Sequence, residues 1–163
     1  MSDALAKSFK SGPHAVLAKL VGKWEGSART WFEPGKLADT SPVKGRIKLV
    51  LGGTFAQHEY SGKLVGHRMK GLALLGYSLG EKQWQCAWVN NLHNGTRIML
   101  SLGKPGANAK SPDVLGSYPA GPETWGWRTT LTLKGRDRLI LRHYNITPKG
   151  EEGLGVEFDY RRV

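Results

Sequence analysis

Short segments of alternating side chains, separated by turn sequences, fill most of the chain and constrain its fold more than any other feature. Three of them stand in a row at the centre: Gly71–Tyr77, Gln83–Val89 and Thr96–Leu102. Successive strand residues point to opposite faces of a sheet, so this alternation predicts half-buried antiparallel strands. The same pattern before and after this stretch brings the total to about ten strands, joined by turns that contain Gly, Asn and Pro.

Many short strands joined by local turns are typical of an antiparallel sandwich or an up-and-down barrel. The barrel is favoured because each turn leads directly into the next strand, and because the 22 glycines suit the bends of a strongly coiled sheet. We therefore predict an all-β fold, an antiparallel up-and-down β-barrel of about ten strands. Before it, the spacing of Val16, Leu17 and Leu20 predicts one short helix that begins at Pro13 and ends before Gly22.

The chain of 163 residues is long enough for one substantial core, and it contains no internal repeat or low-complexity tract. We expect residues 1–10 to form a flexible N-terminal tail and residues 11–163 to form a single barrel domain. Two polar stretches, Lys36–Pro42 and Gly103–Thr124, are expected to be loops. The second stretch contains one short candidate strand, Val114–Tyr118.

The charge of the chain narrows the choice of partners. The 24 Lys and Arg residues exceed the 13 Asp and Glu residues and give a formal net charge of +11, which attracts anionic partners non-specifically. The basic residues do not cluster, however, because Lys44, Arg46 and Lys48 alternate with apolar residues as on a solvated outer face. We therefore expect no nucleic-acid partner. An interaction module that uses the basic outer face is kept as an alternative function.

The N-terminal segment lacks the apolar core of a secretory signal, and no apolar run reaches the ~18 residues of a membrane span. The single cysteine, Cys86, cannot form an internal disulfide. It lies on the expected inner face, so a buried structural thiol is favoured over a nucleophile. These features predict a cytoplasmic protein without a membrane partner, and they leave a homodimer open.

One strand carries the strongest indication of a binding site. Trp84, Cys86, Trp88 and Asn90 share a face, so two large rings, a thiol and an amide line one wall of the expected interior. Barrels of this size can enclose a ligand cavity. We predict that the cavity holds a small, mostly apolar or amphipathic molecule, oriented by amide and imidazole groups. The predicted ligand-binding residues are His58, Tyr60, Trp84, Trp88, Asn90, His93, Trp127 and His143.

Several phrases of the sequence resemble a bacterial family described as a domain of unknown function. They are LVGKWEG at Leu20–Gly26, LGGTF at Leu51–Phe55, HEYSG at His58–Gly62, GLALLGYS at Gly71–Ser78 and AWVNNLHNGT at Ala87–Thr96. The motif Gly22-x-Trp24 after a short helix, with Arg161-Arg162 ending the last strand, also resembles the calycin-type barrels, which include lipocalins, fatty-acid-binding proteins and nitrobindins. The resemblance implies a calycin-like barrel and no established activity.

The resemblance also bears on the chemistry of the site. Asn90 stands where the family usually has Asp, and Ser78 stands where it usually has an acidic residue, so acid catalysis at these positions is not expected. The resemblance to nitrobindins implies a second alternative, a haem-binding barrel with His143 as axial ligand. No His-Glu-x-x-His spacing indicates a zinc site.

The sequence gives little support for an enzyme, because no paired carboxylates, phosphate loop or nucleophile–base arrangement can be assembled. Gly76–Gly80 matches the Gly-x-Ser-x-Gly elbow of serine hydrolases, but the elbow requires a helix after the serine, and a strand is predicted there. A competing strand register would turn Arg128 or Arg142 inward to meet a carboxylate. The outward register is favoured because Trp127 and its neighbours on alternate positions already occupy the inner face.

Overall fold

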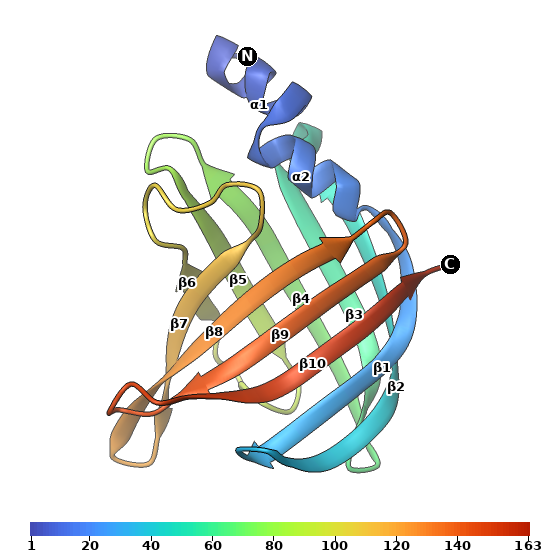
Figure 1. Cartoon of the computed structure of the whole chain (residues 1–163), viewed down its shortest axis with the longest axis vertical. Coiled ribbons are helices and arrows are strands. Elements are labelled where there is room, and N and C mark those ends of the chain that lie inside the picture. Colours follow the sequence, from blue (N-terminus) through green and yellow to red (C-terminus); the bar gives the residue numbers. More distant parts are fainter.

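Hairpin connections join ten antiparallel strands in chain order, and pairing between the first and the last strand closes them into a barrel (Figure 1). The strands are β1 (Gly22–Glu33), β2 (Lys36–Val50), β3 (Phe55–Leu64), β4 (His67–Ser78), β5 (Gln83–Asn90), β6 (Met99–Leu102), β7 (Asp113–Ala120), β8 (Glu123–Lys134), β9 (Arg138–Ile146) and β10 (Glu152–Arg162). The computed structural model describes residues 1–163. The predicted all-β, up-and-down barrel of about ten strands is confirmed.

The barrel wall is continuous, but its seams differ in length. Across the closing seam between β1 and β10, pairing runs from Trp24 with Arg162 to Thr30 with Val156. The seam between β6 and β7 is the shortest, because β6 has four residues and a single pair, Leu102 with Leu115, joins the two strands. Closure gives every strand two neighbours, so no strand has a whole edge free to pair with another chain.

Three segments differ from the predicted boundaries. Lys36–Pro42, expected to be a polar loop, belongs to β2 because it pairs with β1. It extends beyond the part of β2 that pairs with β3, so Pro42 lies on a free edge where a missing N–H is tolerated. The expected loop Gly103–Thr124 contains all of β7, and the strand predicted at Thr96–Leu102 begins only at Met99.

Two short helices precede the barrel, and a single 3-10 turn joins β2 to β3: α1 (Asp3–Ser11), α2 (Pro13–Leu20) and η1 (Leu51–Gly53). Residues 3–10, expected to lie in a flexible tail, are part of α1. The Ser2 hydroxyl caps α1 by accepting a hydrogen bond from the Leu5 amide at 3.3 Å. The buried Ser8 Oγ lies 2.7 Å from His14 Nδ1, which fastens α1 to α2 and supplies the docking that so short a helix needs.

Helix α2 covers one end of the barrel, called the helix end below (Figure 1). Its Leu17 and Leu20 are buried in the core. Trp24, at the start of β1, donates a hydrogen bond from Nε1 to the Leu20 carbonyl at 3.0 Å. The Arg162 guanidinium lies 4.2 Å from the centre of the Trp24 ring and donates to the Lys19 carbonyl at 3.0 Å. Trp24 and Arg162 thus lock α2 onto the barrel, and the opposite end is called the mouth.

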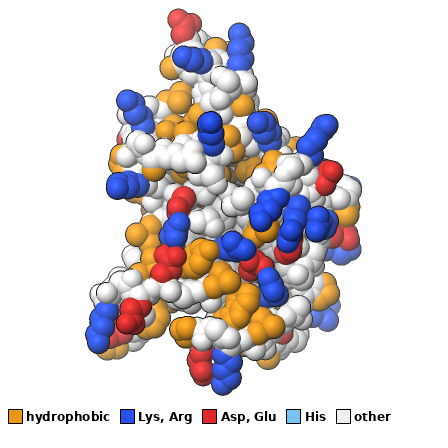
Figure 2. All heavy atoms as spheres, viewed as in Figure 1, with side chains coloured by type: hydrophobic (Ala, Val, Ile, Leu, Met, Phe, Trp, Pro, Cys, Tyr) orange, Lys and Arg blue, Asp and Glu red, His pale blue; other side chains and the backbone are white.

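The charged side chains of the strands lie on the outer face. Figure 2 shows Lys and Arg side chains spread over one side of the molecule, with Asp and Glu side chains among them. Arg128 binds Asp113 through two hydrogen bonds of 2.9 and 2.8 Å. Arg29 and Arg142 both bind Glu157, whose side chain they cover. The register that would turn Arg128 or Arg142 inward is therefore excluded.

We predict that Arg162→Ala lowers the free energy of unfolding by about 2 kcal/mol, because it removes a cation–π contact and charged hydrogen bonds to backbone carbonyls of α2. Urea denaturation followed by circular dichroism measures the loss. The control is Arg161→Ala, at the exposed neighbouring position, which should change the free energy of unfolding by less than about 0.5 kcal/mol. Equal losses in the two variants would contradict the locking role of Arg162.

Candidate functional site

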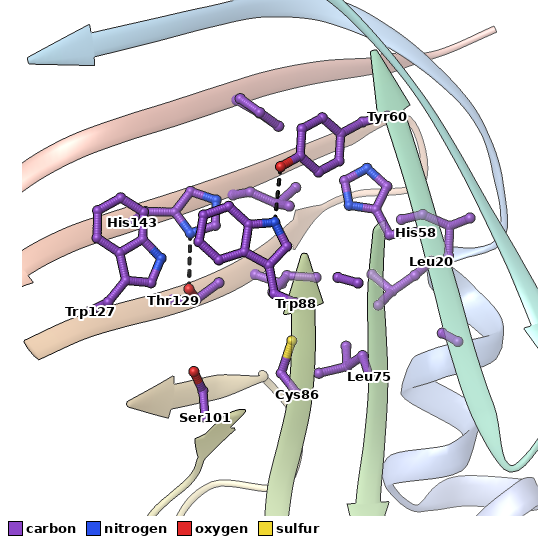
Figure 3. Close-up of a pocket in the computed structure, with 16 residues that line it drawn as sticks. Leu20, His58, Tyr60, Leu75, Cys86, Trp88, Ser101, Trp127, Thr129 and His143 are labelled. Carbon is purple, nitrogen blue, oxygen red and sulfur yellow. Dashed lines mark hydrogen bonds between the residues drawn. The ribbon is translucent and has the colours of Figure 1, made fainter. Parts of the chain in front are cut away.

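Strand β5 turns its aromatic face inward. Trp84 and Asn90 are buried, and Cys86 and Trp88 line an enclosed cavity of about 50 Å³. The cavity lies between α2, which contributes Leu20, and the middle of the barrel (Figure 3). Its lining is mainly apolar. The alternation of β5 thus places the side chains as the sequence predicted.

The eight predicted ligand-binding residues do not all meet at this cavity. Those that line it are His58, Tyr60, Trp88, Trp127 and His143. Asn90 is buried next to it, and His93, in the loop between β5 and β6, lines a second hollow together with Trp88 and Trp127. Trp84 lies toward the helix end of β5, where its ring packs against that of Tyr77 with 5.2 Å between the ring centroids. The structure therefore brings five of the predicted residues together and separates Trp84 from them.

Three rings, those of Trp88, Trp127 and His143, form what we call the aromatic layer. They reach inward from β5 on one side and from β8 and β9 on the other (Figure 3). Their centroids are 5.8, 5.9 and 5.4 Å apart, and their planes lie within 17° of one another. A single column of stacked rings would place the outer two much farther apart, so the stacked rings are offset laterally from one another. The aromatic layer thus partitions the barrel interior.

A second hollow of about 150 Å³ lies on the other side of the aromatic layer, at the mouth. Trp88 and Trp127 line both this mouth hollow and the enclosed cavity. The remaining wall of the mouth hollow includes Thr30 from β1, Asn94 from the loop between β5 and β6, and Tyr118 from β7. Two hollows, one enclosed and one at the barrel end, therefore share a wall of two tryptophans.

A hydrogen-bond network holds Trp88 in the aromatic layer. The Tyr60 hydroxyl accepts one bond from Trp88 Nε1 and one from Asn90 Nδ2, both at 2.9 Å. Asn90 Oδ1 in turn accepts from the backbone amides of Leu92 and His93, at 2.6 and 2.8 Å. These two amides can only donate, so they fix which end of the Asn90 amide faces Tyr60. An aspartate here would lack the N–H that reaches the tyrosine, which explains what Asn90 contributes.

The two inner histidines are neutral. Burial lowers the pKa of His58 to about 4 and the pKa of His143 to about 3, so neither imidazole carries a charge near neutral pH. His58 Nε2 lies 3.1 Å from the Tyr160 hydroxyl, and His143 Nδ1 lies 2.9 Å from Thr129 Oγ1. Each ring therefore keeps one nitrogen without a hydrogen-bond partner in the protein. The site offers neutral polar groups and aromatic surface.

The thiol in the cavity wall is unreactive. Burial raises the pKa of Cys86 to about 12, and the thiolate is the form that acts as a nucleophile. The Gly-x-Ser-x-Gly phrase forms the β4–β5 hairpin, where the Ser78 hydroxyl accepts from the Glu81 amide at 3.2 Å. It therefore lacks the strand–turn–helix geometry of a hydrolase elbow.

Haem does not fit the residues around His143. The rings of Trp88 and Trp127 lie within 5.9 and 5.4 Å of the imidazole centre, where a macrocycle would have to sit. The enclosed cavity beside them has only about 50 Å³. No cluster of three or more His, Cys, Asp or Glu side chains is placed to hold a metal ion. The alternative of a haem barrel with His143 as axial ligand is not supported by this geometry.

Sequence reasoning missed three contributors to the site. Thr129 follows Trp127 by two positions on β8, so strand alternation already indicated that both face inward. Tyr160 on β10 is fully buried and could have been found in the same way. Asn94 lies in a loop, and no periodic signal places a loop side chain against a hollow.

Comparison with known proteins places the fold. A family model described as "Protein of unknown function (DUF1579)" matches residues 10–162. No curated protein matches the sequence. The S-type phycobiliprotein lyase CPES from Guillardia theta superposes with a TM-score of 0.53 at 10% identity, covering 100% of this chain and 98% of that one. A de novo designed fluorescence-activating β-barrel gives a TM-score of 0.45 at 12% identity, covering 91% and 97%. The likeness to the lyase shows a shared fold alone.

The neutral state of His143 predicts how stability depends on pH. The unfolded chain binds a proton at this histidine below its ordinary pKa of 6.5, whereas the folded protein excludes it down to about 3. Stability is thus fully present above about pH 6.5 and falls with acid by about 1.4 kcal/mol per pH unit for this group. We predict that, between about pH 6 and pH 4.5, the unfolding free energy of His143→Gln falls less steeply with acid than that of the wild type. The two slopes, measured by urea denaturation, should differ by about 1.4 kcal/mol per pH unit.

The matched control for this experiment is His67→Gln, because His67 is exposed on β4. The unfolding free energy of His67→Gln should change with pH as that of the wild type does. An unchanged slope in His143→Gln would show that His143 is protonated in the folded barrel, contrary to its burial in the aromatic layer.

Proposed function

The chain belongs to the DUF1579 family, described as proteins of unknown function, and we propose that it binds a small, mostly apolar or amphipathic molecule inside its barrel. The observation that carries this proposal is the pair of hollows that share Trp88 and Trp127 as a wall. Ligand sites are concave, mostly apolar and equipped with a few placed polar groups, as these hollows are.

The sizes of the hollows indicate where the ligand lies. Both hollows are smaller than the roughly 300 Å³ of a typical ligand pocket, and the mouth hollow, at about 150 Å³, is larger than the enclosed cavity, at about 50 Å³. We therefore place the body of the ligand in the mouth hollow, against the aromatic layer. The enclosed cavity behind the layer gives its rings room to shift when the ligand presses on them.

Binding by this site would rest on burial and on preorganised rings. Each Å² of apolar surface removed from water contributes about 25 cal/mol, and flat rings favour flat ligands through stacking. Tyr60 and Asn90 hold the Trp88 ring in place before the ligand arrives, which limits the entropy lost on binding. His143 stays neutral within the aromatic layer, so it adds no charge to the site. Of the predicted residues, Trp84 is the one that this proposal leaves out.

The basic outer face gives weaker support for an interaction module. Its cations are interspersed with carboxylates, as in the ion pairs of Lys44 with Glu25 and Lys48 with Glu59. The buried tryptophans face inward and offer no stacking platform for single-stranded nucleic acid. None of the helices has the length and apolar character needed to cross a membrane. The homodimer and the cytoplasmic location stay predictions from the sequence.

Filling the mouth hollow should abolish binding. The probe is N-phenyl-1-naphthylamine, an uncharged dye that fluoresces in dry apolar sites. We predict that the wild type raises its fluorescence and that Thr30→Phe, which adds a ring to the wall of the mouth hollow, weakens the affinity at least about tenfold. Thr40→Phe, at an exposed position of β2, is the matched control and should bind as the wild type does.

The unfolding temperatures of both variants are measured as well, and values near that of the wild type would show that the barrel is intact. A wild type that leaves the dye dark would contradict the proposed function, as would equal binding by Thr30→Phe.

A further inference from the structure

The aromatic layer contains a hydrogen-bond donor that no protein group uses. Trp127 is 8% exposed, and its Nε1 is buried without a hydrogen-bond partner in the protein. The other indole of the layer is satisfied, because Trp88 Nε1 donates to the Tyr60 hydroxyl. Buried indole N–H groups usually find an acceptor, and leaving one unpaired is costly. The free donor of Trp127 lies in the wall that both hollows share (Figure 3).

A second unpartnered donor lines the same mouth hollow. Asn94 Nδ2 is buried and has no hydrogen-bond partner in the protein. Asn94 and Trp127 lie on separate segments, the β5–β6 loop and β8, yet both line this one hollow. One acceptor of this hollow, Asn145 Oδ1, accepts from the Tyr118 hydroxyl at 2.5 Å and not from either of these donors. Two buried donors of the mouth hollow are therefore left without an acceptor in the protein.

The charge of the lining restricts the ligand further. Neither hollow is lined by a Lys, Arg, Asp or Glu side chain. A charged group moved into such a site would lose its hydration without gaining a counter-charge, which is strongly unfavourable. Arg128 and Arg142 cannot supply that counter-charge, because both are bonded to carboxylates on the outer face. An uncharged acceptor is the group that suits these donors.

From these three observations we infer that the ligand is an uncharged, flat, conjugated molecule with a carbonyl-type oxygen, and that Trp127 Nε1 donates a hydrogen bond to that oxygen. The inference rests on the proposed function and narrows it to one class of ligand. The nearly parallel rings of the layer supply the flat surface on which the conjugated part lies. Asn94 lines the same hollow, so its unpartnered Nδ2 is the proposed donor to a second acceptor of the ligand.

Two probes of similar shape separate the hydrogen bond from simple burial. Acetophenone carries a carbonyl on an aromatic ring, and ethylbenzene has the same ring without the oxygen. Affinities are measured by titration followed in ¹H–¹⁵N spectra of the indole N–H groups. We compare the ratio of the two affinities in each variant, because this ratio cancels general changes in packing. Removing the donor in Trp127→Phe should lower the preference for acetophenone by about tenfold, as expected for the loss of one hydrogen bond.

Trp84→Phe is the matched control. Trp84 is equally buried and its Nε1 also lacks a partner, but it lines neither hollow. Its substitution should leave the ratio unchanged. In the wild type, acetophenone should also shift the Trp127 indole proton downfield, and ethylbenzene should not.

The outcomes distinguish the two levels of the proposal. If both probes bind and Trp127→Phe leaves their ratio at the wild-type value, the hydrogen bond from Trp127 is refuted while the binding function stands. If neither probe binds the wild type, the inference and the proposed function both fail. A ratio that falls equally in Trp84→Phe would also overturn the assignment to Trp127.

Discussion

The site depends on the Trp88 ring being held across the barrel interior by the Tyr60 hydroxyl. This hydroxyl accepts hydrogen bonds from the indole N–H of Trp88 and the side-chain amide of Asn90, and Asn90 Oδ1 accepts from two backbone amides of the following loop. One buried network therefore sets a wall of the enclosed cavity, the position of the aromatic layer and the start of the loop that carries Asn94. Without this network, the Trp88 side chain could adopt other rotamers and would not be held against Trp127 and His143.

The two ends of the barrel serve different purposes. At the helix end, Trp24 and Arg162 fasten α2 to the strand ends, and Leu20 of that helix forms the floor of the enclosed cavity. At the mouth, Trp88 and Trp127 of the aromatic layer line a hollow whose wall also includes Thr30 and Tyr118. Helix α2 covers the enclosed cavity from one end, and the mouth hollow lies at the other, so the proposed ligand enters at the mouth. Rigidity is concentrated in the strands, where a preorganised site loses least on binding.

Much of this arrangement could be predicted from the alternation of inward-facing and outward-facing residues along the strands. The inward face of β5, the outward cations of β2 and the order of the strands follow from a period of two and from turn residues. The hydrogen bond between Tyr60 and Asn90 could not be predicted from this alternation. It joins residues thirty positions apart, which meet only because β3, β4 and β5 pair as they do. The same reasoning explains Trp84: its face was predicted, but its distance along the barrel axis was not, and this separates it from the hollow. Helix α1 was missed because its stability comes from the contact between Ser8 and His14.

The most direct test of this account is a crystal structure of the protein with N-phenyl-1-naphthylamine bound. We expect density for the dye in the mouth hollow, with one ring lying on Trp127 and Trp88, and with the aromatic layer displaced toward the enclosed cavity. The outer face of β6 and β7 offers an alternative apolar surface, since Leu100, Leu102 and Leu115 are exposed there. Density on those leucines, with an empty mouth and unmoved rings, would contradict the account.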